Sequence, residues 1–457
     1  MSSTEIIKRR DFIKLLGAGT AAVSTAAYAQ SGENAPAGLE ALLSPSPKTE
    51  MTMRPDKTGK KVSLLGYGGM RWPTKQQEGR RGGPIDQEKV DELIDYAMKH
   101  GVNYYDTAPV YHGGQSERAM GKSLSRYSRK SYYIATKLSN FNPAQWDFDS
   151  SKEMYENSFE QLGVKYIDFY LLHSLGAGKE QFDNRFLKNG MLEFLISERK
   201  KGRIKRLGFS FHGDRESFLY ALNQDVDWDF VQIQLNYFDW SQDADNRPGA
   251  AYMYNELDKR GIPIVVMEPL LGGRLANLND KLLAELKQRD VDQSPAAWAF
   301  RFVGTQPRIM TALSGMTYMQ HLEENIRTFS PLKPLTEDEQ TFLQETATAM
   351  MKYPTVPCTA CRYCMPCPFN VDIPANFAYL NKCIEAGAIP ASRQSGNYAK
   401  LREAFLSNFD NSVPQKTQSL NCTECKHCVP LCPQHIKIPE QMKRINQLVE
   451  NLKNNTL

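Results

Sequence analysis

The chain has 457 residues, of which 41% are hydrophobic and 24% charged, and its formal net charge is +4. This composition is typical of a folded globular protein and excludes a disordered or collagen-like chain. The small net charge argues against a general nucleic-acid binder, which would carry a concentrated basic face, so we expect no nucleic acid among its partners. All nine cysteines lie between Cys358 and Cys432, which excludes a disulfide framework through the whole chain and indicates two regions of different chemistry.

Residues 1–29 are predicted to be an export signal. A basic segment over 8–14 precedes an apolar stretch over 15–27, and Ala27-Tyr28-Ala29 supplies a small-x-small cleavage site. The pair Arg9-Arg10 resembles the twin-arginine signal; an ordinary secretory signal and a plain amphipathic N-terminus are the alternatives. We therefore expect export by the twin-arginine route to the periplasm. Residues 30–50 are rich in Gly, Pro, Ser and Ala and are predicted to be a linker.

No segment after this signal holds 18 consecutive apolar residues, so no stable membrane span is expected once the signal is removed. Between residues 51 and 335, eight apolar runs of strand length alternate with amphipathic helical stretches. The predicted strands are 62–65, 104–105, 132–135, 167–172, 206–211, 230–235, 264–267 and 309–313, and the predicted helices include 87–99, 117–125, 152–162, 191–201, 215–222, 252–260 and 295–303.

Turn and cap residues agree with this division. Gly101, Gly202 and Gly261 each follow a predicted helix, as a C-terminal cap would, and Asp86 and Ser151 are predicted N-caps. Eight β/α units predict an α/β fold, a (β/α)8 TIM barrel over residues 51–335. A doubly wound open sheet is the alternative, but it usually has a Gly-x-Gly-x-x-Gly turn after its first strand, and the glycines at 66, 68 and 69 do not have that spacing.

Four residues with acid–base side chains follow consecutive predicted strands. Because active sites of such barrels lie at the carboxyl ends of the strands, these side chains should meet in one pocket. A lysine beside a tyrosine lowers the pKa of the phenol from about 10, and a carboxylate would hold that lysine in place. The phenol could then protonate a carbonyl oxygen as hydride reaches the carbon, while an imidazole orients the carbonyl. The candidates are Asp106 and Tyr111 after the second strand, Lys137 after the third and His173 after the fourth.

The segments around these residues resemble the catalytic tetrad motifs of the aldo-keto reductase superfamily. They read Tyr-Tyr-Asp-Thr-Ala-Pro-Val-Tyr over 104–111, Ala-Thr-Lys-Leu over 135–138 and Leu-Leu-His-Ser over 171–174, and Gly-Gln-Ser-Glu over 114–117 also matches. The resemblance covers about residues 55–335. It implies a tetrad in which Tyr111 is the acid, a small-molecule carbonyl or alcohol substrate, and NAD(P)H as a possible cofactor.

The resemblance also implies a nicotinamide pocket, in which this chain departs from the family pattern. Family members usually carry Ser-Asn after the fifth strand, but here Phe211 follows the serine. Met267 stands where an aromatic residue commonly stacks on nicotinamide, and His321 stands where an arginine meets the 2′-phosphate of NADP, so no preference for NADP is implied. The implied cofactor-binding residues are Ser210, Gln232, Met267, Ser314, Gly315, Met316, Glu324 and Asn325.

The cysteine-rich tail is an internal repeat. A Cys-x₂-Cys-x₂-Cys-x₂-Cys-Pro run over 358–368 is followed by Cys-x₂-Cys-x₂-Cys-x₃-Cys-Pro over 422–433. The second spacing ligates [4Fe–4S] clusters, and in two-cluster ferredoxins the fourth Cys of a run ligates the other cluster. We therefore predict two [4Fe–4S] clusters. Cys358, Cys361, Cys364 and Cys432 would hold one, and Cys367, Cys422, Cys425 and Cys428 would hold the other.

Zinc is an alternative metal, since Cys₄ zinc sites also use Cys-x₂-Cys, and a disulfide module is another alternative in an oxidising compartment. The ninth cysteine, Cys383, lies outside both motifs and is expected to be a buried apolar thiol. His427 is expected to be exposed rather than a ligand. Helices are predicted over 373–385 and 399–408, and a helix over 336–351 would join the two regions. Residues 336–457 resemble an α-helical ferredoxin domain, a small and mostly helical unit.

Two functions remain open at this point. The first is an exported iron–sulfur oxidoreductase whose clusters pass electrons to or from the barrel, with a redox protein as a possible partner. An export signal creates a difficulty for free nicotinamide dinucleotide, so either that cofactor is bound before export or the clusters replace it as electron source. The second function is a non-catalytic electron-transfer or docking protein on a barrel that no longer uses nicotinamide. The four acid–base residues argue for the enzyme.

Overall fold

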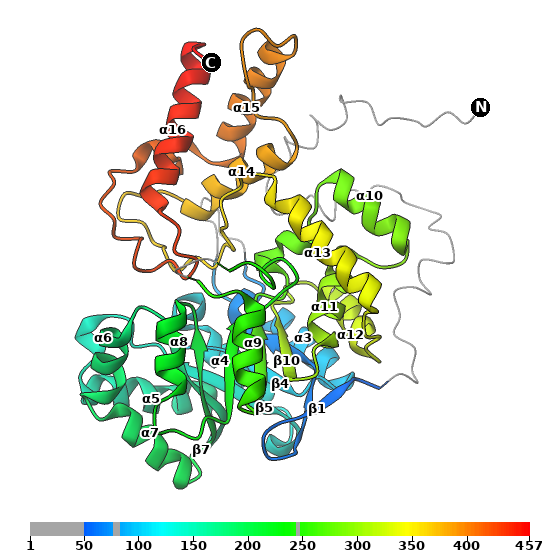
Figure 1. Ribbon diagram of the computed structural model, residues 1–457. Coiled ribbons are helices and arrows are strands. Elements are labelled where there is room, and N and C mark those ends of the chain that lie inside the picture. Colours follow the sequence, from blue (N-terminus) through cyan, green and yellow to red (C-terminus); the bar gives the residue numbers. More distant parts are fainter. Residues whose placement is uncertain (1–49, 76–82, 244–246) are drawn as a thin grey trace. The chain divides into compact units, whose positions relative to one another are not determined.

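The barrel is a closed sheet of eight parallel strands. A computed structural model describes residues 50–75, 83–243 and 247–457, and in it the strands follow the order β10-β3-β4-β5-β6-β7-β8-β9 around the barrel (Figure 1). This confirms the predicted (β/α)8 barrel and excludes the open sheet. The strands are β3 Leu65–Gly68, β4 Tyr104–Asp106, β5 Tyr133–Leu138, β6 Ile167–Leu175, β7 Ile204–Phe211, β8 Phe230–Gln234, β9 Ile264–Met267 and β10 Ile309–Ser314.

The first predicted strand was wrong in its boundaries. Residues 61–63 belong to β2 (Lys61–Ser63), which pairs antiparallel with β1 (Met53–Pro55) in a separate hairpin, and the first barrel strand is β3. Val62 of the hairpin is buried in the same apolar cluster as Tyr104 and Phe169 inside the barrel. An apolar run that continues from the hairpin into the barrel therefore covers two strands, and hydrophobicity alone does not separate them.

Helices follow the barrel strands as expected and end at the predicted glycines. Gly101, Gly202 and Gly261 all have positive φ, as C-terminal caps require. Asp86 stands at the N-cap position of α3 but makes no capping hydrogen bond with its side chain. The Ser151 prediction was wrong, because Asp147 caps α5 through Ser150 N and Ser151 lies inside the helix. The helices are α3 Gln87–Lys99, α4 Ser116–Leu124, α5 Phe148–Leu162, α6 Lys179–Phe182, α7 Met191–Lys200, α8 Arg215–Leu222, α9 Ala250–Lys259, α10 Asp280–Arg289, α11 Pro295–Thr305, α12 Met319–Phe329 and α13 Glu337–Met351.

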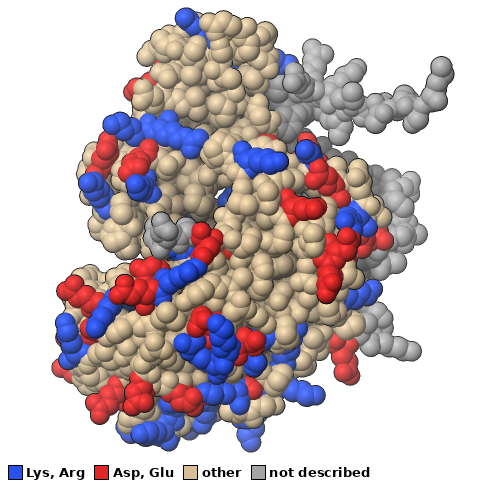
Figure 2. Space-filling view, viewed as in Figure 1, with Lys and Arg blue, Asp and Glu red and all other residues tan. Residues whose placement is uncertain are grey.

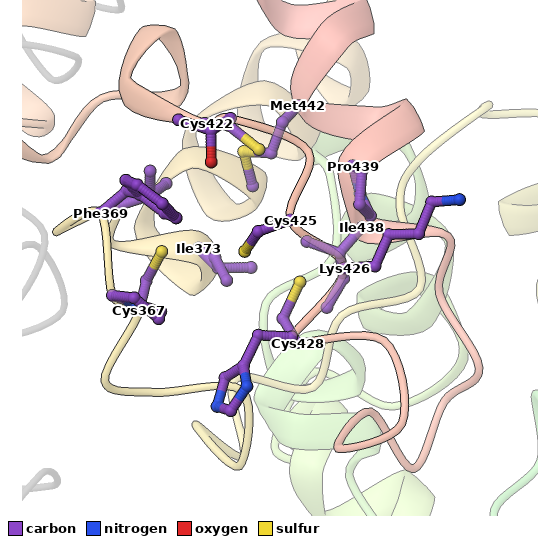
Figure 3. Close-up of a pocket in the computed structure, with 14 residues that line it drawn as sticks. Cys367, Phe369, Ile373, Cys422, Cys425, Lys426, Cys428, Ile438, Pro439 and Met442 are labelled. Carbon is purple, nitrogen blue, oxygen red and sulfur yellow. The ribbon is translucent and has the colours of Figure 1, made fainter.

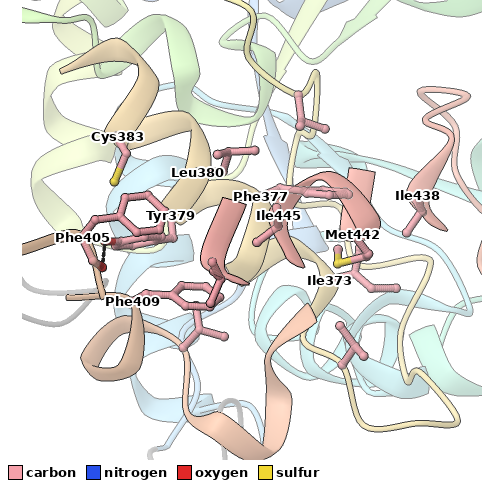
Figure 4. Packing of buried hydrophobic residues seen from close by; sticks show 14 of the residues in the cluster. Ile373, Phe377, Tyr379, Leu380, Cys383, Phe405, Phe409, Ile438, Met442 and Ile445 are labelled. Carbon is pink, nitrogen blue, oxygen red and sulfur yellow. Dashed lines mark hydrogen bonds between the residues drawn. The ribbon is translucent and has the colours of Figure 1, made fainter. Parts of the chain in front are cut away.

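Residues 349–457 form a second compact unit. Its helices are α14 (Ile373–Glu385), α15 (Tyr398–Ser412) and α16 (Ile438–Asn454), the last of which was not predicted. They share one apolar core, in which aromatic rings of α14 and α15 pack against aliphatic side chains of α16 (Figure 4). The hydroxyl of Tyr379 donates a 2.6 Å hydrogen bond to the carbonyl of Phe405, so the polar end of this buried ring is satisfied. Cys383 is 1% exposed in this core, as predicted.

The other compact unit ends at residue 348, within α13. The predicted signal over 1–29 and all but the last residue of the predicted linker lie outside the described residues. No helix in the described ranges is both long and apolar enough to cross a membrane. On the barrel face seen in Figure 2, acidic and basic side chains are interspersed and no single-sign surface forms there.

Candidate active site and metal centre

A buried ion pair joins the first two candidate catalytic residues. Asp106 ends β4 and Lys137 lies near the end of the neighbouring strand β5. The Lys137 ammonium donates to both carboxylate oxygens of Asp106, at 2.6 and 2.7 Å, and to the carbonyl of Thr107 at 2.7 Å. Lys137 is completely buried, so all three donors of its ammonium are used by the protein itself.

Tyr111 and His173 lie beside this pair. The Lys137 ammonium is 5.0 Å from the centre of the Tyr111 ring. The rings of Tyr111 and His173 meet edge to face with 6.0 Å between their centres. Tyr111 sits just beyond β4, and His173 lies in β6 where the pairing with β7 shifts register. The structure therefore brings all four residues of the predicted tetrad together at the carboxyl ends of adjacent strands.

Burial and neighbouring charges set the protonation states of this group. Burial lowers the pKa of Lys137 and Asp106 opposes that effect, while burial raises the pKa of Asp106 and Lys137 opposes it. Because the two are hydrogen-bonded to each other, the ion pair is the state that satisfies both. The pKa of His173 lies well below its usual value, first because of burial and then because of the Lys137 and Arg185 charges. His173 is thus neutral at pH 7.

Three residues that the sequence interpretation missed support His173. The hydroxyl of Ser139 is 2.6 Å from His173 Nδ1. Arg185, which is 1% exposed, donates to the His173 carbonyl at 2.8 Å and to Asn140 Oδ1 at 3.1 and 3.2 Å. Its complete enclosure lowers the pKa of the guanidinium to about 9. Ser139 could have been found, because it lies two residues after Lys137, directly beyond the end of β5, where the alternation of the strand places it on the same side.

Residues of the predicted nicotinamide pocket lie on the next strands. Ser210 and Gln232 are register partners on β7 and β8, and Gln232 Nε2 lies 3.5 Å from the sulfur of Met267 on β9. The Ser210 hydroxyl accepts a 2.8 Å hydrogen bond from Ser174 N. Gln232 Oε1 is buried, and within the described residues it has no hydrogen-bond partner. Phe211 packs its ring against Phe218 and adds no polar group.

The segment after β10 contains the remaining predicted cofactor residues. Asn325 on α12 donates to the Ser314 hydroxyl at 3.0 Å, and both side chains are buried. The Met316 carbonyl accepts from the Tyr67 hydroxyl at 2.5 Å. A Cβ at Gly315 would lie 3.0 Å from the side chain of Arg71, so any larger residue would require that side chain to shift. Glu324 is half-buried one turn along α12 from the exposed His321.

Four cysteines from both halves of the repeat surround one cavity. Its lining includes Cys367 from the first motif and Cys422, Cys425 and Cys428 from the second (Figure 3). In the described part of the chain, no three His, Cys, Asp or Glu side chains lie close enough together to hold a single ion. Three thiols at Cys-x₂-Cys-x₂-Cys spacing joined by a fourth from the other motif are the ligand set of a [4Fe–4S] cluster in two-cluster ferredoxins. His427 also borders this cavity and is exposed.

The second cysteine set has the partners expected from the first. Burial raises the pKa of Cys364, and the nearby thiols of Cys361, Cys358 and Cys432 raise it further. The loops carrying both sets repeat the same left-handed residues at matching positions: Ala360, Arg362 and Asn370 in the first half, and Glu424, Lys426 and His435 in the second. Such αL turns direct backbone N–H groups into a concave site, which suits an anionic cluster. The residues present therefore fit two clusters.

With this geometry in view, comparison with known proteins gives the family. The aldo/keto reductase family model matches residues 64–347, which is more than half of the chain. The chain belongs to the aldo/keto reductase family. It is therefore an oxidoreductase, and its (β/α)8 barrel corresponds to the matched residues. In this aldo/keto reductase a 4Fe-4S dicluster domain matches residues 357–437, the segment that holds both cysteine motifs.

Individual relatives of this aldo/keto reductase are distant. L-galactose dehydrogenase of Arabidopsis thaliana is 22% identical over 311 residues, which are 62% of this chain and 89% of the relative. The holo form of aldo-keto reductase AKR11C1 from Bacillus halodurans is 21% identical with a TM-score of 0.52, covering 65% of this chain and 96% of that one. An aldo-keto reductase crystallised with NADPH is 17% identical with a TM-score of 0.51, covering 65% and 88%. At these identities the two structures show the shared fold.

Proposed function

We propose that this aldo/keto reductase interconverts a small-molecule carbonyl and its alcohol, with Tyr111 as the general acid and base, and that two [4Fe–4S] clusters relay the electrons. The observation that carries the proposal is the Asp106–Lys137 ion pair, whose ammonium lies 5.0 Å from the Tyr111 ring. A fixed positive charge beside a phenol stabilises the phenolate that remains after proton transfer. Asp106 holds that charge in place.

Reduction of the carbonyl adds one hydride, equivalent to two electrons and one proton, to carbon and one proton to oxygen. Tyr111 would give the second proton to the oxygen, and His173 would donate a hydrogen bond to the same oxygen. Burial of Lys137 and Asp106 keeps water from weakening their effect on the phenol. A bound nicotinamide would supply the hydride. Without nicotinamide, one electron from each of the two clusters together with one proton from solvent would take the place of the hydride, and a redox partner protein would supply those electrons.

The chain retains part of a nicotinamide site. Gln232 Oε1 is a buried acceptor in need of a donor, which the amide group of a nicotinamide would provide, and Met267 borders it. Ser210 lies on the adjacent strand in register with Gln232. Phe211 favours the alternative function, a non-catalytic electron-transfer or docking protein, because it removes the polar group that family members usually have there. The cofactor is thus NAD(P)H bound at Gln232, or the clusters alone.

Substitution of the acid separates the two functions. We expect Tyr111→Phe to lower the turnover of a probe aldehyde such as 4-nitrobenzaldehyde by about 10²- to 10⁴-fold, because the ring stays but the proton donor is lost. The assay uses the full chain with its clusters, with NADPH in one arm and chemically reduced protein without dinucleotide in the other. Tyr127→Phe is the matched control, since Tyr127 hydrogen-bonds Asp95 on the barrel's outside. Equal turnover in wild type and Tyr111→Phe would remove Tyr111 from the mechanism.

Cysteine variants test the clusters and their ligands. We expect about eight iron atoms and eight acid-labile sulfides per chain, and about half of each after Cys367→Ser or Cys422→Ser, because both line the same cavity. The double variant should lose no more than either single one. Cys383→Ser is the control, because that thiol lies in the apolar core. One zinc per chain without sulfide would contradict the proposal.

We propose that the protein acts in the periplasm after export by the twin-arginine route. The support is the sequence of residues 1–29, in which Arg9-Arg10 precedes an apolar stretch. This route suits a protein that receives its clusters before export. Fractionation of cells that express the full chain should show it in the periplasm, and replacing both arginines by lysine should retain it in the cytoplasm. Unchanged export of that variant would indicate an ordinary secretory signal.

A further inference from the structure

The surroundings of Ser139 determine which group donates in its hydrogen bond with His173. Ser139 directly follows β5 (Tyr133–Leu138), is 1% exposed, and its hydroxyl lies 2.6 Å from His173 Nδ1. Among the described residues this is the one hydrogen bond that the hydroxyl makes. A hydroxyl has a single hydrogen to donate, and a buried one must donate it to some acceptor. The acceptor available to Ser139 is the ring nitrogen.

We propose that Ser139 is a positioning residue that holds His173 in the tautomer with a lone pair on Nδ1 and the proton on Nε2. In the opposite tautomer, Nδ1–H would donate to the serine oxygen, and the serine hydrogen would be left buried without an acceptor. The same argument disfavours the imidazolium, in which Nδ1 also carries a proton. This agrees with the strongly lowered pKa of His173.

Other contacts keep the ring in the position that this tautomer needs. Arg185 holds the backbone of His173 through its carbonyl at 2.8 Å, and it holds Asn140, the neighbour of Ser139, through Oδ1. The Phe141 ring packs against the imidazole with 4.9 Å between ring centres. One guanidinium thus fixes both partners of the Ser139–His173 contact. The N–H donor of the ring is then Nε2, and the Tyr111 ring meets the imidazole edge to face with 6.0 Å between ring centres.

The consequence for catalysis rests on the proposed function. Two donors, the Tyr111 hydroxyl and His173 Nε2–H, would converge on one carbonyl oxygen. A pyridine-type nitrogen at Nε2 would instead direct a lone pair at that oxygen and repel it. The tautomer decides whether His173 attracts or repels the substrate oxygen, and Ser139 decides the tautomer.

The tautomer is measured by nuclear magnetic resonance on the full chain with its clusters, labelled with ¹⁵N at histidine. The chain has seven histidines, and His173→Gln assigns the signal by its disappearance. In the wild type we expect a pyridine-like shift for Nδ1 and a pyrrole-like shift for Nε2 at pH 7. A pyrrole-like Nδ1, or an imidazolium, overturns the proposal whether or not the protein reduces carbonyls.

Variants at Ser139 then connect the tautomer to turnover. Ser139→Ala should move both ¹⁵N shifts toward their average, because neither tautomer is then selected, and should lower the turnover of 4-nitrobenzaldehyde by about tenfold, less than a full loss of an oxyanion donor. Ser139→Thr keeps the hydroxyl and should restore both. Ser123→Ala is the matched control, since that buried serine hydroxyl contacts Asp91 on a peripheral helix. Wild-type shifts in Ser139→Ala would show that something else selects the tautomer.

Discussion

The barrel and the C-terminal unit differ in what provides the partners of their reactive side chains. In the barrel, the Lys137 ammonium donates all its hydrogen bonds to Asp106 and Thr107, so the chain itself supplies every partner that this charge needs. In the C-terminal unit the cysteine thiols surround a cavity, and burial raises the pKa of Cys364 above its usual value and that of Cys428 to about 11. Thiols become good metal ligands only as thiolates, so this second site is completed by its metal. The barrel is preorganised by its sequence, and the C-terminal unit depends on what it binds.

Removal of the clusters should produce the largest difference between the two units. We expect oxidative removal of iron from the full chain, in the presence of a chelator, to abolish hydrogen-exchange protection in the cysteine loops over 357–372 and 418–437. The loops have little regular secondary structure of their own, and metal binding supplies much of the folding free energy of such sites. Strands β3 to β10 should keep their protection. Equal loss in both units would show that the barrel also depends on the clusters.

Breaking the ion pair should be the next largest effect. Lys137→Met leaves the Asp106 carboxylate buried without its partner, which we expect to cost about 3–5 kcal/mol of unfolding free energy. Asp106→Asn together with Lys137→Met removes both charges and should recover part of that loss. Denaturant unfolding followed by tryptophan fluorescence measures the change. A loss below about 1 kcal/mol for the single variant would mean that the site is less enclosed than the structure indicates.

The smallest effect concerns pH and His173. Its folded pKa lies well below the unfolded value of about 6.5, so below pH 6.5 the unfolded chain takes up a proton that the folded one does not. The contribution of neutral His173 to the unfolding free energy is therefore fully present above pH 6.5. It falls as the pH decreases below 6.5, by up to about 1.4 kcal/mol per pH unit. Unfolding of wild type and His173→Gln between pH 7.5 and 5.5 should differ by this slope. Parallel curves would show that His173 is protonated in the folded state.

Much of the barrel and of its site could be predicted from the sequence, because strand period and strand ends are local properties. Asp106, Lys137 and His173 each follow or end an apolar run, and the closed barrel brings such positions together. The start of the first strand could not be predicted, because Val62 and Leu65 are both apolar although Val62 belongs to the hairpin and Leu65 to the barrel.

Residues whose roles depend on contacts with distant parts of the sequence also could not be predicted. Arg185 reaches His173 and Asn140 from the π-helical turn η5 (Asp183–Leu187), and no periodicity in its own segment marks that reach. Serine is a common N-cap residue, which is why the sequence predicts a cap at Ser151, but Asp147 four residues earlier caps the helix here. Helix α16 escaped because its start at Ile438 follows the cysteine loops directly. In the cysteine motifs the spacing itself carried the information, since ligands three residues apart must share a loop.

The placement of Cys367 bears on when the protein becomes complete during its synthesis. Cys367 is made with the first motif but lines the cavity of the second, and Cys364 of the first motif has Cys432 as a neighbour. Neither set of four is therefore whole until the ribosome has released the second motif, which ends with Cys432. A nascent or truncated chain that lacks the second motif holds only three cysteines of one set and one of the other. We therefore expect such a product to lack both proposed clusters rather than one of the two, which would make completion of the chain and acquisition of its metal centre a single all-or-none event.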